Sequence, residues 1–304
     1  MKIVVTGGSG FIGRVVVKQL RMEGYKVVSF DILPINNGIK VDLTDKHQVK
    51  TALERVKPEI VIHLAAMAGA KGKGGGVESL KDPYKYLWVN IYGTLNIFEA
   101  CRELRIGHIL CMSSFAPFGI TKCSITETSP FQPNNPYGTS KVCMEEVAKC
   151  YSVAYGIKTV IFRAPLICGE GQKEMNVLRE FVTSTLQNVP IVILGEGKHV
   201  REFIHPHDIA KAYSAGISYI LKMDKPYDIF ILGNKPVTIK ELAELVIRKV
   251  GKGSIEFRSA NNKVFDQFTD YSKVIRVLKW MPALDINEIV DRVIDDVKKM
   301  MLKS

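Results

Sequence analysis

The chain has 304 residues, of which 46% are hydrophobic and 24% charged, a composition typical of a soluble globular protein with room for two lobes. Its apolar runs are shorter than the roughly 18 residues that a bilayer-spanning helix requires, so we expect no membrane segment. The formal net charge of +11 is spread along the chain and no basic stretch is interleaved with aromatic residues, so nucleic acid is not an expected partner.

The first half of the sequence alternates short apolar runs with helical patterns. The alternation indicates an α/β fold of the Rossmann type, a doubly wound parallel sheet with helices on both faces. In such a sheet, ligands bind at the carboxyl ends of the strands. The predicted strands are 3–5, 26–30, 60–64, 109–112 and 158–163, and the predicted helices run from a glycine-rich turn to about 22, over 86–104 and over 137–155.

The second half is punctuated by proline and glycine, and its strands are shorter. We predict a Rossmann domain over 1–164, joined by a segment near 199–233, and a smaller α/β lobe over 165–304 that binds the substrate. Residues 71–76 read Lys-Gly-Lys-Gly-Gly-Gly, which indicates a flexible loop or a mobile flap beside a ligand. The helical patterns of this half lie at 177–188, 208–221, 238–250 and 286–302.

The first turn has the pattern of a dinucleotide-binding site. Gly7 and the run Gly10-Phe11-Ile12-Gly13 follow the first strand and open the first helix, so the backbone can approach a pyrophosphate at a helix N-terminus. Asp31 ends the second strand, where a carboxylate accepts hydrogen bonds from the adenosine ribose and repels a 2′-phosphate. The predicted cofactor is therefore NAD rather than NADP.

Three further stretches are predicted to line this cofactor. Asp42 and Leu43 follow the short third strand, where Asp42 either contacts the adenine amino group or caps the next helix. Leu64-Ala65-Ala66 ends the fourth strand with small residues that let a cofactor lie close, after His63, which we interpret as buried and structural. Asn90 is a poor residue for a helix interior, so we expect it to hold the active-site strand or a water.

Chemistry is indicated by Tyr137 and Lys141, four residues apart at the start of a predicted helix. At that spacing their Cβ atoms lie roughly 5–6 Å apart, and a nearby ammonium favours the phenolate form of tyrosine, which can then act as a base. Ser113 and Ser114 end the fifth strand without the G-x-S-x-G sequence of a hydrolase nucleophile. A hydroxyl at this position is instead expected to hydrogen-bond a substrate oxygen in the cofactor cleft.

No metal site is expected. His205 and His207 lack matching distant ligands, and His207-Asp208 is typical of a helix N-terminus. The six cysteines contain no C-x-x-C pair and several lie in apolar patterns. We therefore predict reduced thiols in a cytoplasmic protein.

Together these residues resemble the extended short-chain dehydrogenase/reductase family, and within it the NAD-dependent nucleotide-sugar epimerases and dehydratases of the UDP-glucose 4-epimerase kind. The resemblance covers nearly the whole chain and continues through 194–208, 241–243 and 278–282. It implies that Tyr137 is the acid/base, that Lys141 lowers its pKa and holds the nicotinamide ribose, and that Ser114 bonds the reacting hydroxyl. Members of the family commonly form homodimers through two long helices, here 86–104 and 137–155.

Some positions depart from the family pattern. The dehydratases carry Asp-Glu after the catalytic threonine, whereas this sequence has Phe115-Ala116, which argues against dehydration. Leu166 stands where many members have an asparagine that faces the diphosphate. Arg201 and Arg258 are candidates for gripping the diphosphate of a nucleotide-sugar substrate, and surface salt bridging is the alternative for both.

We therefore predict an NAD-dependent nucleotide-sugar epimerase that inverts C4 of a UDP-hexose through a 4-keto intermediate. One alternative is an NAD-dependent nucleotide-sugar reductase or dehydrogenase that exchanges its cofactor each cycle. Another is a protein that binds NAD without turnover. The presence of Ser114, Tyr137 and Lys141 together argues against this last alternative.

Overall fold

The computed structural model describes residues 1–34, 38–68, 77–120, 124–259 and 266–302, so the glycine-rich stretch 71–76 lies outside the described residues. Its main sheet is built from β1 (Lys2–Thr6), β2 (Lys26–Asp31), β3 (Ile39–Lys40), β4 (Ile60–His63), β5 (His108–Ser114), β6 (Lys158–Ala164) and β11 (Tyr227–Ile231).

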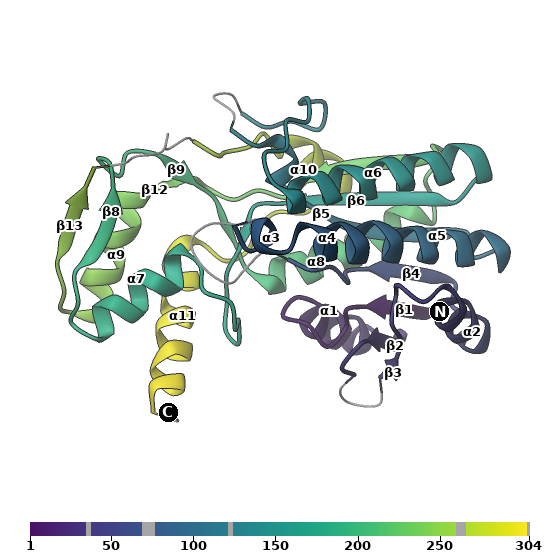
Figure 1. The fold of residues 1–304 in the computed structure, drawn as a ribbon, viewed down its shortest axis with the longest axis horizontal. Coiled ribbons are helices and arrows are strands. Elements are labelled where there is room, and N and C mark those ends of the chain that lie inside the picture. The colour runs from purple at the N-terminus through teal and green to yellow at the C-terminus, as the bar shows by residue number, and fades with distance from the viewer. Residues whose placement is uncertain (35–37, 69–76, 121–123, 260–265, 303–304) are drawn as a thin grey trace.

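These seven strands are all parallel and follow the order β11-β6-β5-β4-β1-β2-β3 (Figure 1). The strand order reverses between β1 and β4, and a doubly wound sheet opens its ligand cleft at that point. The predicted Rossmann-type fold is confirmed.

Helices cover both faces of the sheet, and each face has its own apolar core. Successive residues of β1 point to opposite faces, so Ile3 and Val5 belong to one core and Val4 to the other. Because both faces are covered, the strands are continuous apolar runs rather than alternating ones. The first face carries α1 (Gly13–Met22), α8 (Pro206–Ile220) and α10 (Ser272–Leu278), and the second carries α2 (Lys46–Val56), α5 (Gly93–Glu103) and α6 (Pro136–Tyr155).

A third core belongs to what we call the outer lobe, at the left of Figure 1. The rest of the described chain, around the seven-stranded sheet, is the sheet lobe. The outer lobe has only short paired strands, and three helices pack around them. It comprises β8 (Ile191–Leu194), β13 (Ile255–Arg258), α7 (Val177–Leu186), α9 (Ile239–Val250) and α11 (Ile286–Met301). Two more short strand pairs occur where the chain passes from one lobe to the other. They are β7 (Leu166–Ile167) with β10 (Phe203–Ile204), and β9 (Val200–Arg201) with β12 (Val237–Thr238).

The helix ends follow from their capping residues. Thr238 and Asp285 each form a capping box with a glutamate three residues later, at the starts of α9 and α11. Asn135 accepts the N–H of Gly138 at the start of α6, and Gly156 ends that helix in the left-handed region. These signals lie in the sequence, which is why the predicted helix bounds agree with the structure to within a few residues.

Two helical features differ from the prediction. The helix expected over 86–104 is divided into α4 (Pro83–Leu87), a π-helical turn over Trp88–Tyr92, and α5. The short helix α10, which the sequence analysis did not identify, packs against α8 and β11.

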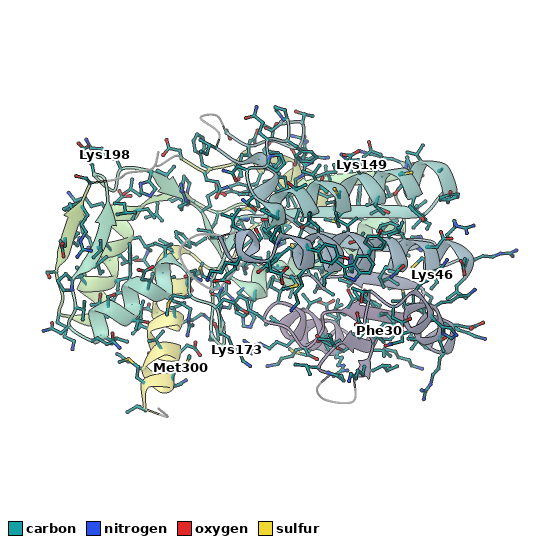
Figure 2. The ribbon with its side chains drawn as sticks, in the orientation of Figure 1. Phe30, Lys46, Lys149, Lys173, Lys198 and Met300 are labelled. Carbon is teal, nitrogen blue, oxygen red and sulfur yellow. The ribbon has the colours of Figure 1, made fainter. Side chains whose placement is uncertain are left out.

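Basic side chains are distributed over the molecule, as the sequence suggests. The labelled Lys46, Lys149 and Lys198 lie at widely separated points of the outline in Figure 2. Among the described residues, none of the helices is both long and apolar enough to span a bilayer.

Candidate active site

The glycine turn between β1 and α1 has no room for side chains at its key positions. A Cβ on Gly13 would lie 2.0 Å from the Gly7 carbonyl oxygen, and a Cβ on Gly7 would lie 2.8 Å from the Ala65 backbone. Gly7 also has a φ of +67°, which favours glycine. At Gly10 an added Cβ would meet only the Gly7 oxygen, at 3.1 Å, so the space over the turn is otherwise open there.

This turn fits the pyrophosphate of a dinucleotide. The helix α1 begins without a side-chain cap, because its N-cap residue is Ile12, so backbone N–H groups and the positive end of the helix dipole remain for an anion. Phe11, Ile12 and the β4-terminal residues Leu64 to Ala66 are all partly exposed beside the turn. The predicted cofactor contacts of this region are therefore placed together by the fold.

Asp31 stands at the carboxyl end of β2 and its carboxylate turns back toward the glycine turn. Its Oδ2 accepts the N–H of Ser9 at 3.0 Å and its Oδ1 accepts the N–H of Leu33 at 3.1 Å. Each oxygen keeps acceptor capacity for a ribose hydroxyl. A carboxylate here can accept hydrogen bonds from ribose hydroxyls, and its negative charge disfavours a 2′-phosphate.

Of the two alternatives for Asp42, contact with the adenine amino group or the cap of the next helix, the cap is wrong. The N-cap of α2 is Asp45, whose carboxylate accepts the N–H groups of His47 and Gln48. The Asp42 carboxylate instead accepts hydrogen bonds from the N–H and the hydroxyl of Thr44. This makes a tight turn just before the N-cap Asp45. The adjacent Leu43 carbonyl accepts a hydrogen bond from Asn96 of α5 at 2.8 Å.

His63 is buried and structural, as predicted. Its Nδ1 lies 2.8 Å from Thr6 Oγ1 and its Nε2 lies 3.0 Å from Thr94 Oγ1. Burial, and secondarily the charge of Lys141, lowers its pKa to about 3, so the ring is neutral. The ring joins β1, β4 and α5 beneath the cleft.

Asn90 lies in the π-helical turn and holds two segments together. Its amide accepts the Met67 N–H at 2.7 Å, donates to the Met67 carbonyl at 3.0 Å, and donates to Ser140 Oγ at 2.8 Å. The chain after β4 is thereby fixed to the face of α6 that carries Ser140. A π-turn often marks a functional site, and here it presents an amide that a regular helix disfavours.

Tyr137 and Ser114 meet where α6 begins and β5 ends. Burial raises the pKa of Tyr137, while a hydrogen bond from Ser114 opposes that rise by favouring the phenolate. The Tyr137 N–H donates to Ser79 Oγ of α3 (Val77–Lys81) at 3.2 Å. Ser79 was not identified from the sequence, because its role depends on a contact between segments 58 residues apart.

Lys141 lies one turn further into the protein. It is 6% exposed, its Nζ donates to the Met112 carbonyl at 2.9 Å, and it lies 6.0 Å from the centroid of the Tyr137 ring. Burial lowers its own pKa to about 8. The predicted lowering of the Tyr137 pKa is therefore not what this structure has: burial dominates, and the ammonium is held by strand β5.

Ser113, predicted as a cofactor contact, directs its side chain elsewhere. It is 2% exposed and donates to Glu145 Oε1 at 2.6 Å. Glu145 is fully buried and forms an ion pair with Arg163, with Nη2 and Oε2 2.8 Å apart. The sequence did not single out this pair, although Glu145 continues the four-residue spacing of Tyr137 and Lys141 and so lies on the same face of α6.

The two arginines proposed for a diphosphate differ in setting. Arg201 on β9 is partly buried and donates to the Val200 carbonyl at 2.8 Å. Arg258 on β13 is exposed and forms an ion pair with Glu256, with 2.7 Å between Nε and Oε1. The surface salt bridge considered for Arg258 is therefore present.

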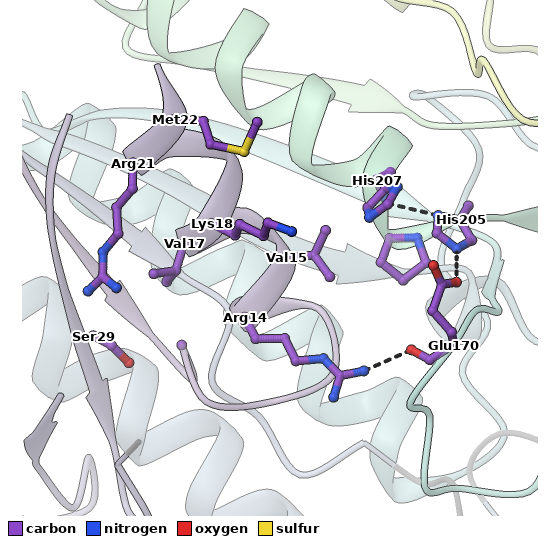
Figure 3. A pocket seen from close by; sticks show the side chains of 12 residues that line it. Arg14, Val15, Val17, Lys18, Arg21, Met22, Ser29, Glu170, His205 and His207 are labelled. Carbon is purple, nitrogen blue, oxygen red and sulfur yellow. Dashed lines mark hydrogen bonds and ion pairs between the residues drawn. The ribbon is translucent and has the colours of Figure 1, made fainter. Parts of the chain in front are cut away.

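A groove of about 670 Å³ runs over α1 behind the glycine turn (Figure 3). At one end, the Glu170 carbonyl accepts from Arg14 at 2.8 Å, and the Glu170 carboxylate contacts His205 Nε2 at 2.6 Å and Arg292 of α11 at 3.0 Å. This group links the sheet lobe to the outer lobe. His205 also caps α8, so the histidines belong to a helix start, and no group of metal-ligating residues occurs in the described ranges.

Comparison with known proteins gives a consistent result. Residues 3–233 match the family model described as the NAD dependent epimerase/dehydratase family. The UDP-glucose 4-epimerase of Streptococcus mutans is 31% identical, over 94% of this chain and 93% of that protein. The crystal structure of the UDP-glucose 4-epimerase of Thermotoga maritima with UDP-glucose matches with a TM-score of 0.87 at 25% identity, covering 99% of this chain and 100% of that one. The Thermus thermophilus UDP-glucose 4-epimerase in complex with NAD matches with a TM-score of 0.83 at 27% identity, covering 98% and 99%.

Proposed function

We propose that this chain, which belongs to the NAD-dependent epimerase/dehydratase family, inverts C4 of a UDP-hexose through a 4-keto intermediate. The observation that carries the proposal is the meeting of Ser114, Tyr137 and Lys141 at the carboxyl end of β5, beside a glycine turn shaped for a dinucleotide. The cofactor is NAD, since the family is NAD-dependent. We propose that Asp31, at the carboxyl end of β2 beside the glycine turn, accepts hydrogen bonds from its adenosine ribose.

The residues divide the work as follows. When bound, NAD supplies a reversible hydride acceptor and a positively charged ring. Tyr137 takes the proton of the sugar 4-hydroxyl and later returns it, and Ser114 hydrogen-bonds the same oxygen. Lys141 provides positive charge near the phenol, which favours the phenolate needed for the first step. In this structure burial outweighs that effect and raises the pKa of Tyr137.

Phe115 and Ala116 support inversion over elimination. These residues follow Ser114, and neither has an ionisable group that could protonate a leaving hydroxyl. Phe115 is 2% exposed and packs inward. Among the nucleotide-sugar reactions of the family, the arrangement is therefore suited to removing and replacing hydrogen at one carbon.

The substrate is proposed as a UDP-hexose because the S. mutans relative and the T. maritima structure carry that activity in their names. We further propose that Arg201 contacts the diphosphate, because its guanidinium is partly buried and burial lowers its pKa. Arg258 is the second proposed contact, although its ion pair with Glu256 would have to open.

We also propose a homodimer in the cytoplasm. Tyr84, Trp88 and Tyr92 form an exposed aromatic ridge on α4 and the π-turn, with the Trp88 and Tyr92 ring centroids 4.1 Å apart. The ridge lies on the helical layer that also contains α5 and α6 (Figure 1), and exposed apolar surface of this kind is typical of an interface. Five described cysteines are free thiols, which suits a reducing compartment. A monomeric wild type at micromolar concentration would contradict the dimer.

The function is tested by what leaves the purified protein on denaturation. Stoichiometric NAD or NADH, identified by absorbance and mass, is the expected result, because an epimerase regenerates its cofactor and holds it tightly. UDP-glucose, UDP-galactose and their N-acetyl and uronic relatives are then screened for inversion. An empty protein that consumes or forms NADH would instead indicate a reductase or dehydrogenase.

A further inference from the structure

The face of α6 that carries Tyr137 and Lys141 continues inward to Glu145. These residues are spaced by four, so they lie one above another on the helix. Their exposure falls from partly exposed Tyr137 to 6% for Lys141 and 0% for Glu145. A fully buried carboxylate is costly unless its oxygens accept hydrogen bonds. The hydrogen-bond partners of Glu145 therefore show to which elements this part of α6 is attached.

Both oxygens of Glu145 are occupied. Oε1 accepts from Ser113 Oγ at 2.6 Å and from Arg163 Nε at 3.0 Å, while Oε2 accepts from Arg163 Nη2 at 2.8 Å. Ser113 and Arg163 are directly opposite residues of the parallel strands β5 and β6. The Glu145 carboxylate therefore connects α6 to both β5 and β6. Its contact with β5 is Ser113, the residue directly before Ser114.

The guanidinium of Arg163 lies against two neighbouring aromatic rings, whose centroids are 5.6 Å apart. Its central carbon is 5.1 Å from the ring centroid of Phe118 and 4.9 Å from that of Phe131. Its Nη1 donates to the Glu127 carbonyl at 2.8 Å. Contact with aromatic rings together with a bidentate carboxylate is a setting that suits arginine better than lysine.

Phe118 belongs to the turn that follows Ser114, whereas Phe131 does not. Phe118 ends a 3₁₀ turn over Ala116–Phe118 that follows Ser114, and the first residue of this turn, Ala116, donates its N–H to Ser114 Oγ at 3.2 Å. The Ala116 carbonyl lies so close to α6 that a Cβ on Gly138 would be 2.6 Å from it. The turn thus touches both Ser114 and the residue next to Tyr137. Phe131 lies outside the turn, on a loop that packs against it: the Gln132 N–H donates to the Pro117 carbonyl at 2.8 Å, and a Cβ on Gly138 would lie 3.3 Å from Pro133.

We propose that Glu145 and Arg163 are positioning residues for the reaction, which hold Ser114 and Tyr137 in register through Ser113 on one side and through the turn ending at Phe118 on the other. Neither side chain reaches the cleft, so both act through other groups. The proposal rests on the proposed function, since it assigns a consequence for turnover. It predicts that removing the Phe118 ring harms the chemical step more than removing the Phe131 ring, because Phe118 is itself part of the turn that contacts Ser114 Oγ.

The two rings provide a matched pair of variants. Phe118→Leu and Phe131→Leu each remove one aromatic face from the same guanidinium. We expect Phe118→Leu to lower kcat about tenfold or more, with KM and bound NAD within twofold of wild type, because a small misplacement of reacting groups is expensive. We expect Phe131→Leu to lower kcat by a clearly smaller factor, because Phe131 lies outside the turn that contacts Ser114. Thermal unfolding of both variants shows whether they lose comparable stability.

Arg163→Lys supplies the second measurement. It retains the charge and loses the fork and the stacking, so kcat should fall as in Phe118→Leu while NAD stays bound. Equal losses of kcat in the two phenylalanine variants, or no loss in either, would overturn the positioning role. An absence of epimerisation by the wild-type enzyme would instead contradict the proposed function, so the two failures are distinguishable.

Discussion

The sheet lobe and the outer lobe differ in where they bury charge. In the sheet lobe, charged and polar groups are buried at the carboxyl ends of strands and satisfy one another, as Glu145 and Arg163 do at 0% and 2% exposure. In the outer lobe, Arg179 and Asp296 form a largely buried pair between helices α7 and α11, at 4% and 16% exposure, while pairs such as Lys249–Asp291 and Arg258–Glu256 have partly or fully exposed partners. Exposed pairs contribute little to stability, whereas breaking a buried pair leaves an uncompensated charge.

The difference indicates that the two lobes have different roles. A preorganised polar network costs desolvation, and it is retained where groups must be held in one geometry. The outer lobe is held by apolar packing of α7, α9 and α11 around short strands, so its surface can vary without disturbing the reacting groups. We therefore expect substitutions in the sheet lobe to change kcat or cofactor retention, and substitutions at the polar surface of the outer lobe to change KM.

The largest expected effect is that of Tyr137→Phe. Removing one hydroxyl eliminates the acid/base, so kcat should fall by about 10² to 10⁴, while NAD remains bound because the glycine turn is untouched. Turnover and released NAD are measured on the same preparation. Activity close to wild type would contradict the assignment of Tyr137.

The next effect is on the glycine turn. In Gly13→Ala the added Cβ would lie 2.0 Å from the Gly7 oxygen and 2.7 Å from the Gly8 Cα, so the backbone must shift. We expect the purified variant to contain less than a tenth of the wild-type NAD. Gly107→Ala is the control, since a Cβ there meets nothing within 4 Å and should leave NAD content unchanged.

Two buried groups predict pH dependences of opposite sign. The pKa of His63 is about 3, below the ordinary 6.5, so the unfolded chain binds a proton that the folded protein does not as pH falls from 6.5 to 3. The free energy of unfolding should therefore decrease over that window, by up to about 1.4 kcal/mol per pH unit. His63→Gln should show a shallower decrease in urea titrations at several pH values. Parallel curves would show that His63 does not contribute.

Glu202, which hydrogen-bonds Asn234 and Thr269, should act in the other direction. Its carboxylate accepts the N–H groups of Thr269 at 2.7 Å and Asn234 at 3.3 Å, yet burial raises its pKa to about 7 from 4.5. The folded state then binds the extra proton, so the wild type should lose stability relative to Glu202→Gln as pH rises from 4.5 to 7. The same urea titrations measure this difference in stability between the two proteins. A wild type that gains stability relative to Glu202→Gln between pH 4.5 and 7 would contradict the burial argument.

The smallest effects are expected in the outer part of the molecule. Arg201→Ala should raise KM for the nucleotide sugar about tenfold with little change in kcat, because the loss is uniform binding. Arg258→Ala should raise KM by a smaller factor than Arg201→Ala, since Arg258 must leave its exposed ion pair with Glu256 before it contacts the diphosphate. A larger effect at Arg258 than at Arg201 would reverse the proposed roles.

The sequence was sufficient where function and local structure coincide. The glycine turn, Asp31 and the Tyr137–Lys141 spacing are local patterns, and the fold follows from apolar runs buried on both faces of a sheet. Contacts between distant segments were not predictable in this way. The Glu145–Arg163 pair, Ser79 beneath Tyr137, and the π-turn that presents Asn90 all depend on how separate elements pack.

Two mistaken expectations have the same origin. Asp42 precedes α2 and looks like a cap, but Asp45 is nearer and takes that role. The Tyr137 pKa was expected to be lowered by Lys141, but spacing along a helix does not reveal how deeply both groups are buried. Burial is a property of the packed molecule, so its effect on ionisation appears only with the structure.

The central claim is internal redox recycling at C4, and isotope transfer tests it most directly. UDP-glucose and UDP-galactose carrying deuterium at C4 are incubated with the purified protein without added NAD, and the products are analysed by NMR and mass. The account predicts products of inverted C4 configuration that keep the deuterium at C4. Loss of the label to solvent, net accumulation of NADH, or no inversion of either sugar would contradict it.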